Sequence, residues 1–142
     1  MGRSWSEPVH AGVCVTRPAA VREARPPGLS EAHILAQTRL ALSRLRTPDN
    51  KRACVCWRQA VGSFRHLYND GTIKVGVEGM ADIGGVLSDG RCLQVETKTA
   101  TGRLREAQVA WREMTISMGG LYVLARSPED ACRAVLEALC KR

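Results

Sequence analysis

The chain has 142 residues, a length that fits one domain with room for a hydrophobic core. Lysine and arginine number 21 against 14 acidic residues, and the resulting formal charge of +7 favours a polyanionic partner such as nucleic acid. No apolar run approaches the roughly 20 residues that a membrane helix needs, and no secretory signal is evident, so we expect no membrane association and a cytoplasmic location.

Residues 1–29 contain four of the six prolines and several arginines, and they show no sustained periodicity. We therefore predict a flexible basic N-terminal arm over 1–29, followed by a single domain over 30–142. Two interpretations of this arm stay open, because a basic tail either helps to bind DNA or is a solvated segment without a role.

The first predicted helix begins after Ser30, a residue type that caps helices, because apolar side chains then recur at helical spacing as far as Leu45. The polar run over 46–51 ends this helix. Residues 53–59, ACVCWRQ, predict a strand by their β-branched and aromatic content. The polar, glycine-rich stretch around 68–71 follows, and no regular element is predicted there.

A β-hairpin is predicted from two strands, Asp82–Leu87 and Cys92–Lys98. The pair Asp89-Gly90 lies between them and supplies the positive φ angles that a tight turn requires. This hairpin is the clearest local feature of the sequence.

A second helix is predicted over 105–117, where Gly119-Gly120 ends it, and residues 121–125, LYVLA, predict a buried strand. Ser127-Pro128 then starts a last helix that reaches Leu139. The order α-β-β-β-α-β-α predicts an α/β fold in which helices flank a mixed central sheet.

The second strand of the hairpin carries an acid and an amine on one face. Period-two geometry sends Leu93, Val95 and Thr97 to one face of the strand, and Gln94, Glu96 and Lys98 to the other. Asp82 opens the partner strand, so its carboxylate is expected near Glu96 once the turn closes. Two carboxylates and one lysine are therefore predicted to converge.

Two carboxylates at one place repel each other unless a cation lies between them, and hard oxygen ligands select Mg²⁺ or Mn²⁺ rather than Zn²⁺. A bound cation of this kind activates water and polarises a phosphoryl oxygen. Taken alone, acids and a lysine in this spacing also fit an ordinary solvated, salt-bridged strand face. The hairpin between two helices is what favours a catalytic interpretation.

In this context the sequence resembles the PD-(D/E)XK nucleases and, among them, the VRR-NUC domain, which occurs alone in phage and bacterial proteins. The resemblance runs from Glu31 through WRQAVG, GVEGMADIGGVLSDGRCLQVETK, GRLREAQVAW and GGLYVLARSPED. It covers nearly everything after the N-terminal arm and implies a PD-(D/E)XK restriction-endonuclease-like core. Ala81 departs from the proline that the family often has before the aspartate, but proline there supplies no ligand.

The resemblance also implies roles for individual residues. Asp82 and Glu96 would bind the metal with the Thr97 main-chain carbonyl, and Lys98 would assist the attacking water. Glu31 would complete the catalytic site. Gln108 matches a catalytic-site glutamine on the helix that follows the strand with Glu96 and Lys98. Gln59 matches a polar position after the first strand and would contact DNA. For Glu31, the plain alternative is an acid that complements the helix dipole.

Arg65 and His66 are candidate phosphate contacts in the glycine-rich stretch, and the alternative is an exposed loop pair without a role. Trp57, Trp111 and Met114 are interpreted as core residues rather than as platforms for stacked bases.

The resulting hypothesis is a Mg²⁺- or Mn²⁺-dependent endonuclease that cuts structured DNA in a bacterial or phage-infected cell. Stand-alone family members imply four-way junctions as the substrate, and symmetric cutting of a junction implies a homodimer. The alternatives are a nuclease of other specificity, such as a flap, single-strand or restriction-type enzyme, and a non-catalytic DNA-binding module.

The six cysteines raise a third alternative, a cysteine-based metal or redox protein, although no CxxC pair occurs. We expect reduced thiols that serve as small core residues.

Overall fold

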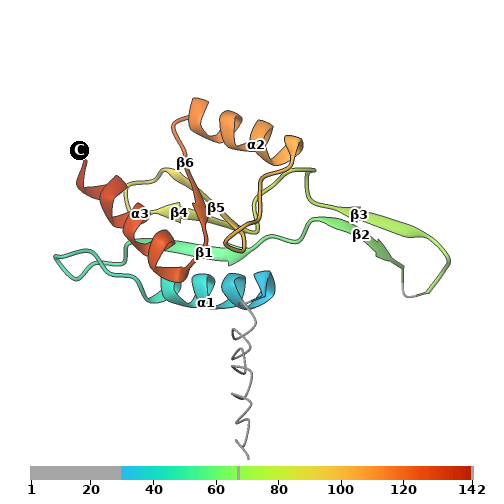
Figure 1. Cartoon of the computed structure of the whole chain (residues 1–142), viewed down its shortest axis with the longest axis horizontal. Coiled ribbons are helices and arrows are strands. Elements are labelled where there is room, and N and C mark those ends of the chain that lie inside the picture. Colours follow the sequence, from blue (N-terminus) through green and yellow to red (C-terminus); the bar gives the residue numbers. More distant parts are fainter. Residues whose placement is uncertain (1–29, 67, 142) are drawn as a thin grey trace, which may run out of the picture.

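The computed structural model describes residues 30–66 and 68–141, so the predicted arm over 1–29 lies outside the described residues. The chain forms an α/β fold with three helices among the described residues (Figure 1). The elements in chain order are α1 (Glu31–Arg44), β1 (Cys54–Arg58), β2 (Gly62–Arg65), β3 (Thr72–Val75), β4 (Ile83–Leu87), β5 (Cys92–Thr97), α2 (Glu106–Ser117), β6 (Leu121–Ala125) and α3 (Pro128–Cys140).

The main sheet has four strands in the order β1-β4-β5-β6. β4 pairs antiparallel with both β1 and β5, whereas β6 runs parallel to β5, so the sheet is mixed as predicted. Helices α1 and α3 cover one face and α2 lies over the other (Figure 1). We call these the α1/α3 face and the α2 face.

The hydrophobic core lies on the α1/α3 face. It is built from alternate residues of the strands and from the inner sides of the two helices, and its buried members include Leu42, Cys54, Ile83, Leu93, Val95, Val123 and Val135. The sequence starts both helices with a serine cap, because the hydroxyl oxygens of Ser30 and Ser127 accept hydrogen bonds from the amides of His33 and Asp130.

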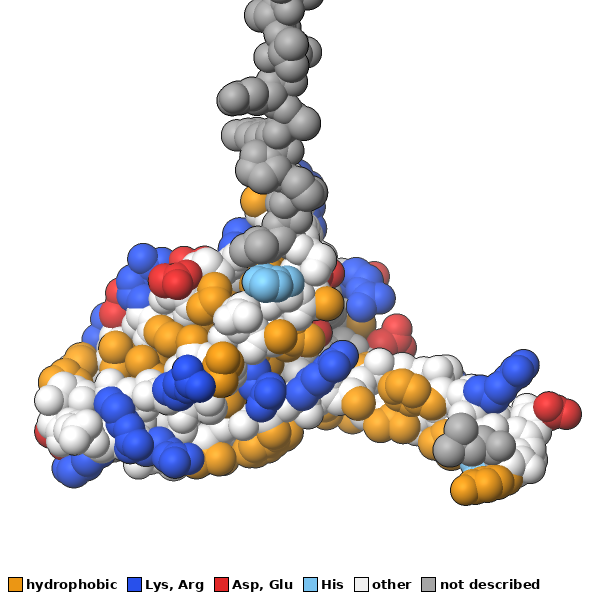
Figure 2. Space-filling model, turned by 90° about the horizontal axis from the view of Figure 1, so that it is seen from below, with side chains coloured by type: hydrophobic (Ala, Val, Ile, Leu, Met, Phe, Trp, Pro, Cys, Tyr) orange, Lys and Arg blue, Asp and Glu red, His pale blue; other side chains and the backbone are white. Residues whose placement is uncertain are grey.

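The predicted element order is wrong at one place, because two strands occupy the stretch that was expected to be irregular. β2 and β3 pair with each other as a separate two-stranded sheet, here called the side hairpin. Figures 1 and 2 show it projecting from one end of the body, with hydrophobic side chains exposed along it. Both strands are only four residues long and every residue in them is exposed, so no buried face distinguishes them from a loop in the sequence.

The β4–β5 turn forms where it was predicted, with one difference in its backbone. Gly90 alone has a positive φ, at 89°, and the Leu87 amide donates to the Arg91 carbonyl. The loop therefore has the three predicted residues, Ser88, Asp89 and Gly90, but only the glycine has a left-handed backbone, whereas the Asp-Gly pair was expected to supply positive φ angles at both positions.

The expected use of cysteines and large side chains is wrong in part. All five cysteines in the described ranges are free, as expected, but only Cys54 is buried, while Cys92 and Cys140 are exposed. Trp57 is 49 % exposed and Met114 is 38 % exposed, so neither is a core residue. Trp57 lies on the edge strand β1, where α2 does not extend to cover it.

Among the described residues, no helix combines the length and the apolar character needed to cross a membrane.

Candidate metal centre

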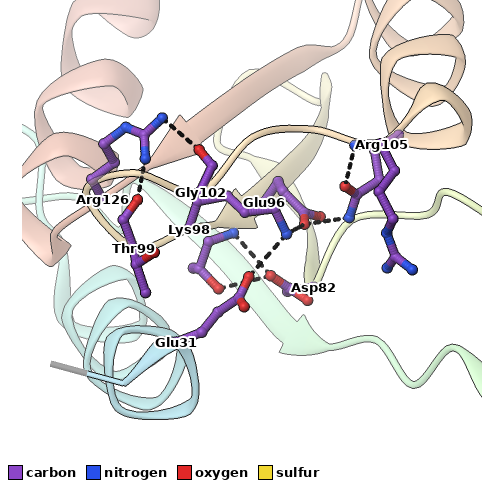
Figure 3. A network of polar contacts seen from close by, with 10 residues as sticks. Glu31, Asp82, Glu96, Lys98, Thr99, Gly102, Arg105 and Arg126 are labelled. Atoms are coloured by element: carbon purple, nitrogen blue, oxygen red, sulfur yellow. Dashed lines mark hydrogen bonds and ion pairs between the residues drawn. The ribbon is translucent and has the colours of Figure 1, made fainter.

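Three carboxylates from three different elements meet at one end of the sheet (Figure 3). Glu31 comes from the first turn of α1, Asp82 directly precedes β4, and Glu96 lies in β5. One oxygen of each lies within 4.8 Å of one oxygen of each of the others. The structure thus brings together the predicted pair and the residue that only the resemblance had assigned to the site.

The strand register explains why Asp82 and Glu96 meet. Ile83 pairs with Val95 across the hairpin, so the residues just outside that pair face each other on the α2 face. Helix α1 begins beside this end of the sheet and adds Glu31 from the side.

Glu96 is fully buried, and its two carboxylate oxygens have different surroundings. Oε1 accepts hydrogen bonds from Lys98 Nζ and from Gln108 Nε2, each at 2.5 Å. Oε2 is buried and has no hydrogen-bond partner among the described residues. Burial raises the pKa of Glu96, the nearby charges of Asp82 and Glu31 raise it further, and Lys98 opposes this shift.

Asp82 is fixed through one oxygen only. Its Oδ2 accepts hydrogen bonds from the Thr97 amide at 2.9 Å and from the Thr97 hydroxyl at 2.7 Å. Within the described ranges, no hydrogen bond reaches Oδ1. This role of the Thr97 side chain was not predicted, and the metal-ligand role of its carbonyl stays a prediction.

Lys98 joins two of the acids. Its Nζ lies 2.9 Å from Glu31 Oε1 and 2.5 Å from Glu96 Oε1. Burial alone would lower the pKa of Lys98, but the hydrogen bonds to Glu96 and Glu31 outweigh it and raise the pKa above its ordinary value. Lys98 is therefore a fixed positive charge at the site.

The segment after Lys98 is held by Arg126, which sequence reasoning missed. The Arg126 guanidinium donates to the Thr99 carbonyl and, at 2.9 Å, to the Gly102 carbonyl (Figure 3). A Cβ at Gly102 would lie 3.2 Å from the Lys98 side chain, so Gly102 lies directly against the lysine stem. In the sequence, the one signal for this role is that Arg126 directly follows β6, the strand that runs parallel to β5.

Helix α2 places Gln108 against Glu96. The Gln108 Oε1 atom accepts from the Arg105 amide at 3.0 Å, which orients the side-chain amide so that Nε2 points at Glu96. One turn further along α2, the Trp111 indole donates to Gln94 Oε1 at 3.1 Å. These two contacts seat α2 over the polar side of β5.

The three residues predicted to contact DNA lie in two different places. Gln59 is next to the centre, because its amide donates to the Asp82 carbonyl at 2.8 Å and its side chain lies over Gly84. Its Oε1 is buried without a partner among the described residues. Arg65 and His66 instead lie at the outer end of β2, away from the carboxylates.

The donor set of the centre fits a hard divalent cation. Three carboxylates against one ammonium leave an excess of two negative charges. Each of Asp82 and Glu96 has one oxygen held by protein donors and a second oxygen without such a donor in the described structure. An orphaned, buried carboxylate oxygen is costly unless a cation or water satisfies it. The oxygen-only donors match Mg²⁺ or Mn²⁺.

Comparison with models of known protein families and with curated proteins finds no match to this chain.

Proposed function

We propose that this chain is a metal-dependent DNA endonuclease of the PD-(D/E)XK type, similar to VRR-NUC domains. The observation that carries the proposal is the group formed by Glu31, Asp82 and Glu96, with Lys98 bonded to two of them. It combines the sequence motif with a three-dimensional arrangement in which the motif residues converge.

Asp82 and Glu96 are the residues that would hold Mg²⁺ or Mn²⁺, through the oxygens that lack protein donors. A cation bound there supplies an activated water and stabilises the negative charge that develops on a phosphoryl group. Thr97 keeps the Asp82 carboxylate in one orientation through two hydrogen bonds.

The remaining side chains orient and balance charge. Lys98 presents its ammonium between Glu31 and Glu96, where it can orient a water or stabilise an anionic phosphoryl oxygen. Gln108 fixes the Glu96 carboxylate from the other side. Both act on atoms that the fold has already aligned, as preorganised catalysis requires.

DNA as the substrate is supported by charge. The chain carries a net charge of +7, and Figure 2 shows basic side chains spread over the side of the body formed by α1 and β1. In the part of the chain that the structure describes, five exposed arginines of α1, β1 and the loop between them form no ion pair, namely Arg39, Arg44, Arg46, Arg52 and Arg58. Unpaired arginines are the usual contacts for DNA phosphates.

For substrate structure we propose four-way junctions, cut by a homodimer, on the strength of the family resemblance. Two active sites related by a two-fold axis would cut two strands symmetrically. Flap, single-strand or restriction-type cutting would use the same centre with different contacts to DNA.

The first experiment tests the metal centre without any nuclease assay. Mn²⁺ or Mg²⁺ should raise the melting temperature of the wild type by roughly 10 °C at about 100 times its Kd. Asp82→Asn should abolish this shift, while Lys51→Ala, an exposed turn substitution, should keep it. Equal shifts in wild type and Asp82→Asn would contradict the proposed centre.

The second experiment tests cleavage of labelled four-way junction, flap, single-stranded and duplex DNA, with Mn²⁺, Mg²⁺ or EDTA. We expect junction cutting by the wild type with metal, and none by Asp82→Asn. Cutting of another substrate would keep the nuclease and change its specificity. Binding without any cleavage would favour the non-catalytic DNA-binding module.

A further inference from the structure

The side hairpin has two chemically different faces, although both are exposed. In its register Gly62 pairs with Val75, and Phe64 with Ile73, so these residues share one face. Phe64 is 49 % exposed and Ile73 is 48 % exposed. The other face carries the remaining strand residues, Ser63, Arg65, Thr72 and Lys74. A two-stranded hairpin with an uncovered apolar face is marginal by itself and gains stability from a partner.

A groove of about 820 Å³ lies between the base of this hairpin and the first turns of α2. Val61, Ser63, Lys74 and Val75 line it from the hairpin side, and Arg105 and Gln108 line it from α2. The volume falls within the range of roughly 300–1,000 Å³ that is typical of small-ligand pockets. It is therefore large enough for a short piece of an extended ligand.

The wall of this groove is fixed by a close backbone contact. A Cβ at Gly79 would lie 2.1 Å from the Ala107 carbonyl oxygen, and Gly79 has a φ of 85°, so only glycine fits there. The segment that returns from the hairpin is thus pressed against the start of α2. This contact fixes the side of the groove that the return segment forms.

Gln108 connects the groove to the metal centre. It lines the groove, and its Nε2 donates to Glu96 Oε1 at 2.5 Å. One side chain therefore separates the groove from Glu96. If the centre cleaves phosphodiester bonds, the groove lies where the chain next to the cleaved bond must pass.

The lining offers both basic and apolar side chains to a nucleic-acid strand. Lys74 and Arg105 form no ion pair among the described residues, although Glu78 and Glu106 also line the groove. Basic side chains contact phosphates, whereas the apolar Val61 and Val75 offer a surface for sugars and bases. Bases are accessible for such contact in a single strand and not in a paired duplex.

We propose that this groove binds a single strand of nucleic acid adjoining the metal centre, with Lys74 and Arg105 contacting its phosphates. This inference rests on the proposed nuclease function and adds the path of the substrate strand. It commits to an unpaired strand, such as the one exposed at a branch, a flap or an end. A second copy of this chain in the same groove is the competing outcome.

The test measures binding of a fluorescein-labelled twelve-nucleotide thymidine strand by anisotropy in EDTA, so that neither metal nor cleavage is involved. The test variant is Lys74→Ala/Arg105→Ala, which keeps the Arg105 backbone amide that orients Gln108. The matched control is Lys51→Ala/Lys141→Ala, which removes the same charge outside the groove. Circular dichroism and the melting temperature confirm that both variants are folded.

We expect the test variant to bind the strand about 10-fold more weakly or worse, and the control to stay within about 2-fold of the wild type. Loss of two phosphate contacts should also make the dependence of log K on log salt shallower by about 1.4. For a twelve-base-pair duplex, we expect the binding affinities of the two variants to differ less. Equal losses in both variants, or none in the test variant, would overturn the proposal.

Light scattering separates the competing occupant. If Lys74→Ala/Arg105→Ala converts a dimer into a monomer and leaves strand binding unchanged, the groove is a protein interface and the proposal is wrong.

The Mn²⁺-induced shift in melting temperature distinguishes the strand-path proposal from the metal-centre proposal. A wild type that shows this shift but no groove-dependent strand binding refutes only the strand path, whereas groove-dependent binding without a shift refutes only the metal centre.

Discussion

The two faces of the central sheet are built from alternate residues of the same strands, yet they have opposite properties. Ile83 and Val95 point to the α1/α3 face and lie fully buried in the core. Their neighbours Asp82 and Glu96 alternate with them, and they meet Glu31 of α1 at the end of the sheet, where Glu96 also contacts α2 through Gln108. The comparison teaches that adjacent positions in one strand can serve stability and chemistry separately, because a strand divides its side chains between two environments.

The difference extends to what covers each face. Two helices pack on the α1/α3 face, and their buried contacts with the sheet are mainly apolar. On the α2 face a single helix covers the β5 and β6 side and contacts it through polar pairs, while Val55 and Val86 remain exposed. An open, polar face is less favourable for stability, but a substrate can reach it.

The largest effect should come from Asp82→Asn on the α2 face. We expect cleavage to fall by about 10³-fold or more, because the proposed metal ligand is lost, while the free energy of unfolding changes by at most about 1 kcal/mol. Cleavage rates and urea denaturation measure the two quantities. A large loss of stability together with activity would mean that the two faces are not separable.

The adjacent substitution, Ile83→Ala on the α1/α3 face, should have the opposite signature. Removing a fully buried side chain should lower the free energy of unfolding by about 2–5 kcal/mol. Cleavage per folded molecule should stay near that of the wild type, measured well below the melting temperature. If activity falls as far as in Asp82→Asn, core packing determines the geometry of the centre.

A smaller effect is expected from Arg126, a positioning residue that acts through Lys98. Arg126→Ala removes the donors to the Thr99 and Gly102 carbonyls, and kcat should fall about 10-fold while KM and the Mn²⁺ melting shift change little. Arg126→Lys, which keeps the charge and one donor group, should recover part of the rate. An unchanged kcat in Arg126→Ala would show that the loop holds Lys98 without this anchor.

The smallest effect concerns thiols at the rim of the α1/α3 face. The neighbouring Cys54 thiol and attraction from Arg39 lower the pKa of the Cys56 thiol against the effect of burial, while the pKa of Cys132 is raised mainly by burial. Below its pKa a thiol is protonated and unreactive, so at neutral pH Cys56 should react with iodoacetamide several-fold faster than Cys132. Site-resolved mass spectrometry measures both rates, and Cys56→Ser provides the control. Equal rates would show that α1 shields Cys56 more than its half-buried state implies.

Much of the α2 face could be predicted because it depends on local rules. The hairpin turn at Gly90 and the alternation along β5 together place Asp82 opposite Glu96, and both features are readable from spacing. Glu31 came from the family resemblance, since nothing in its own surroundings in the sequence indicates that it meets Lys98, 67 positions along the chain.

The parts that were missed depend on contacts without a sequence signature. The Thr97 hydroxyl reaches Asp82 only because of the strand register, and Arg126 reaches its carbonyls across the loop that follows β5. The side hairpin was missed for a different reason. Its alternation, clear in Ile73, Lys74 and Val75, spans too few residues to separate a strand from a polar loop.

The place where the side hairpin enters the fold gives it an unusual freedom. Arg58 and Ile83 are direct partners in the β1–β4 ladder, and the Gln59 amide still bonds to the Asp82 carbonyl, so the chain leaves and re-enters the sheet across a single ladder step. The intervening residues form an insertion whose two ends are already joined by the scaffold. The outer part of such an insertion, beyond the contact of Gly79 with α2, can be lengthened, shortened or exchanged without shifting the register that aligns Asp82 with Glu96. The side hairpin is thus a replaceable insertion beside the candidate metal centre.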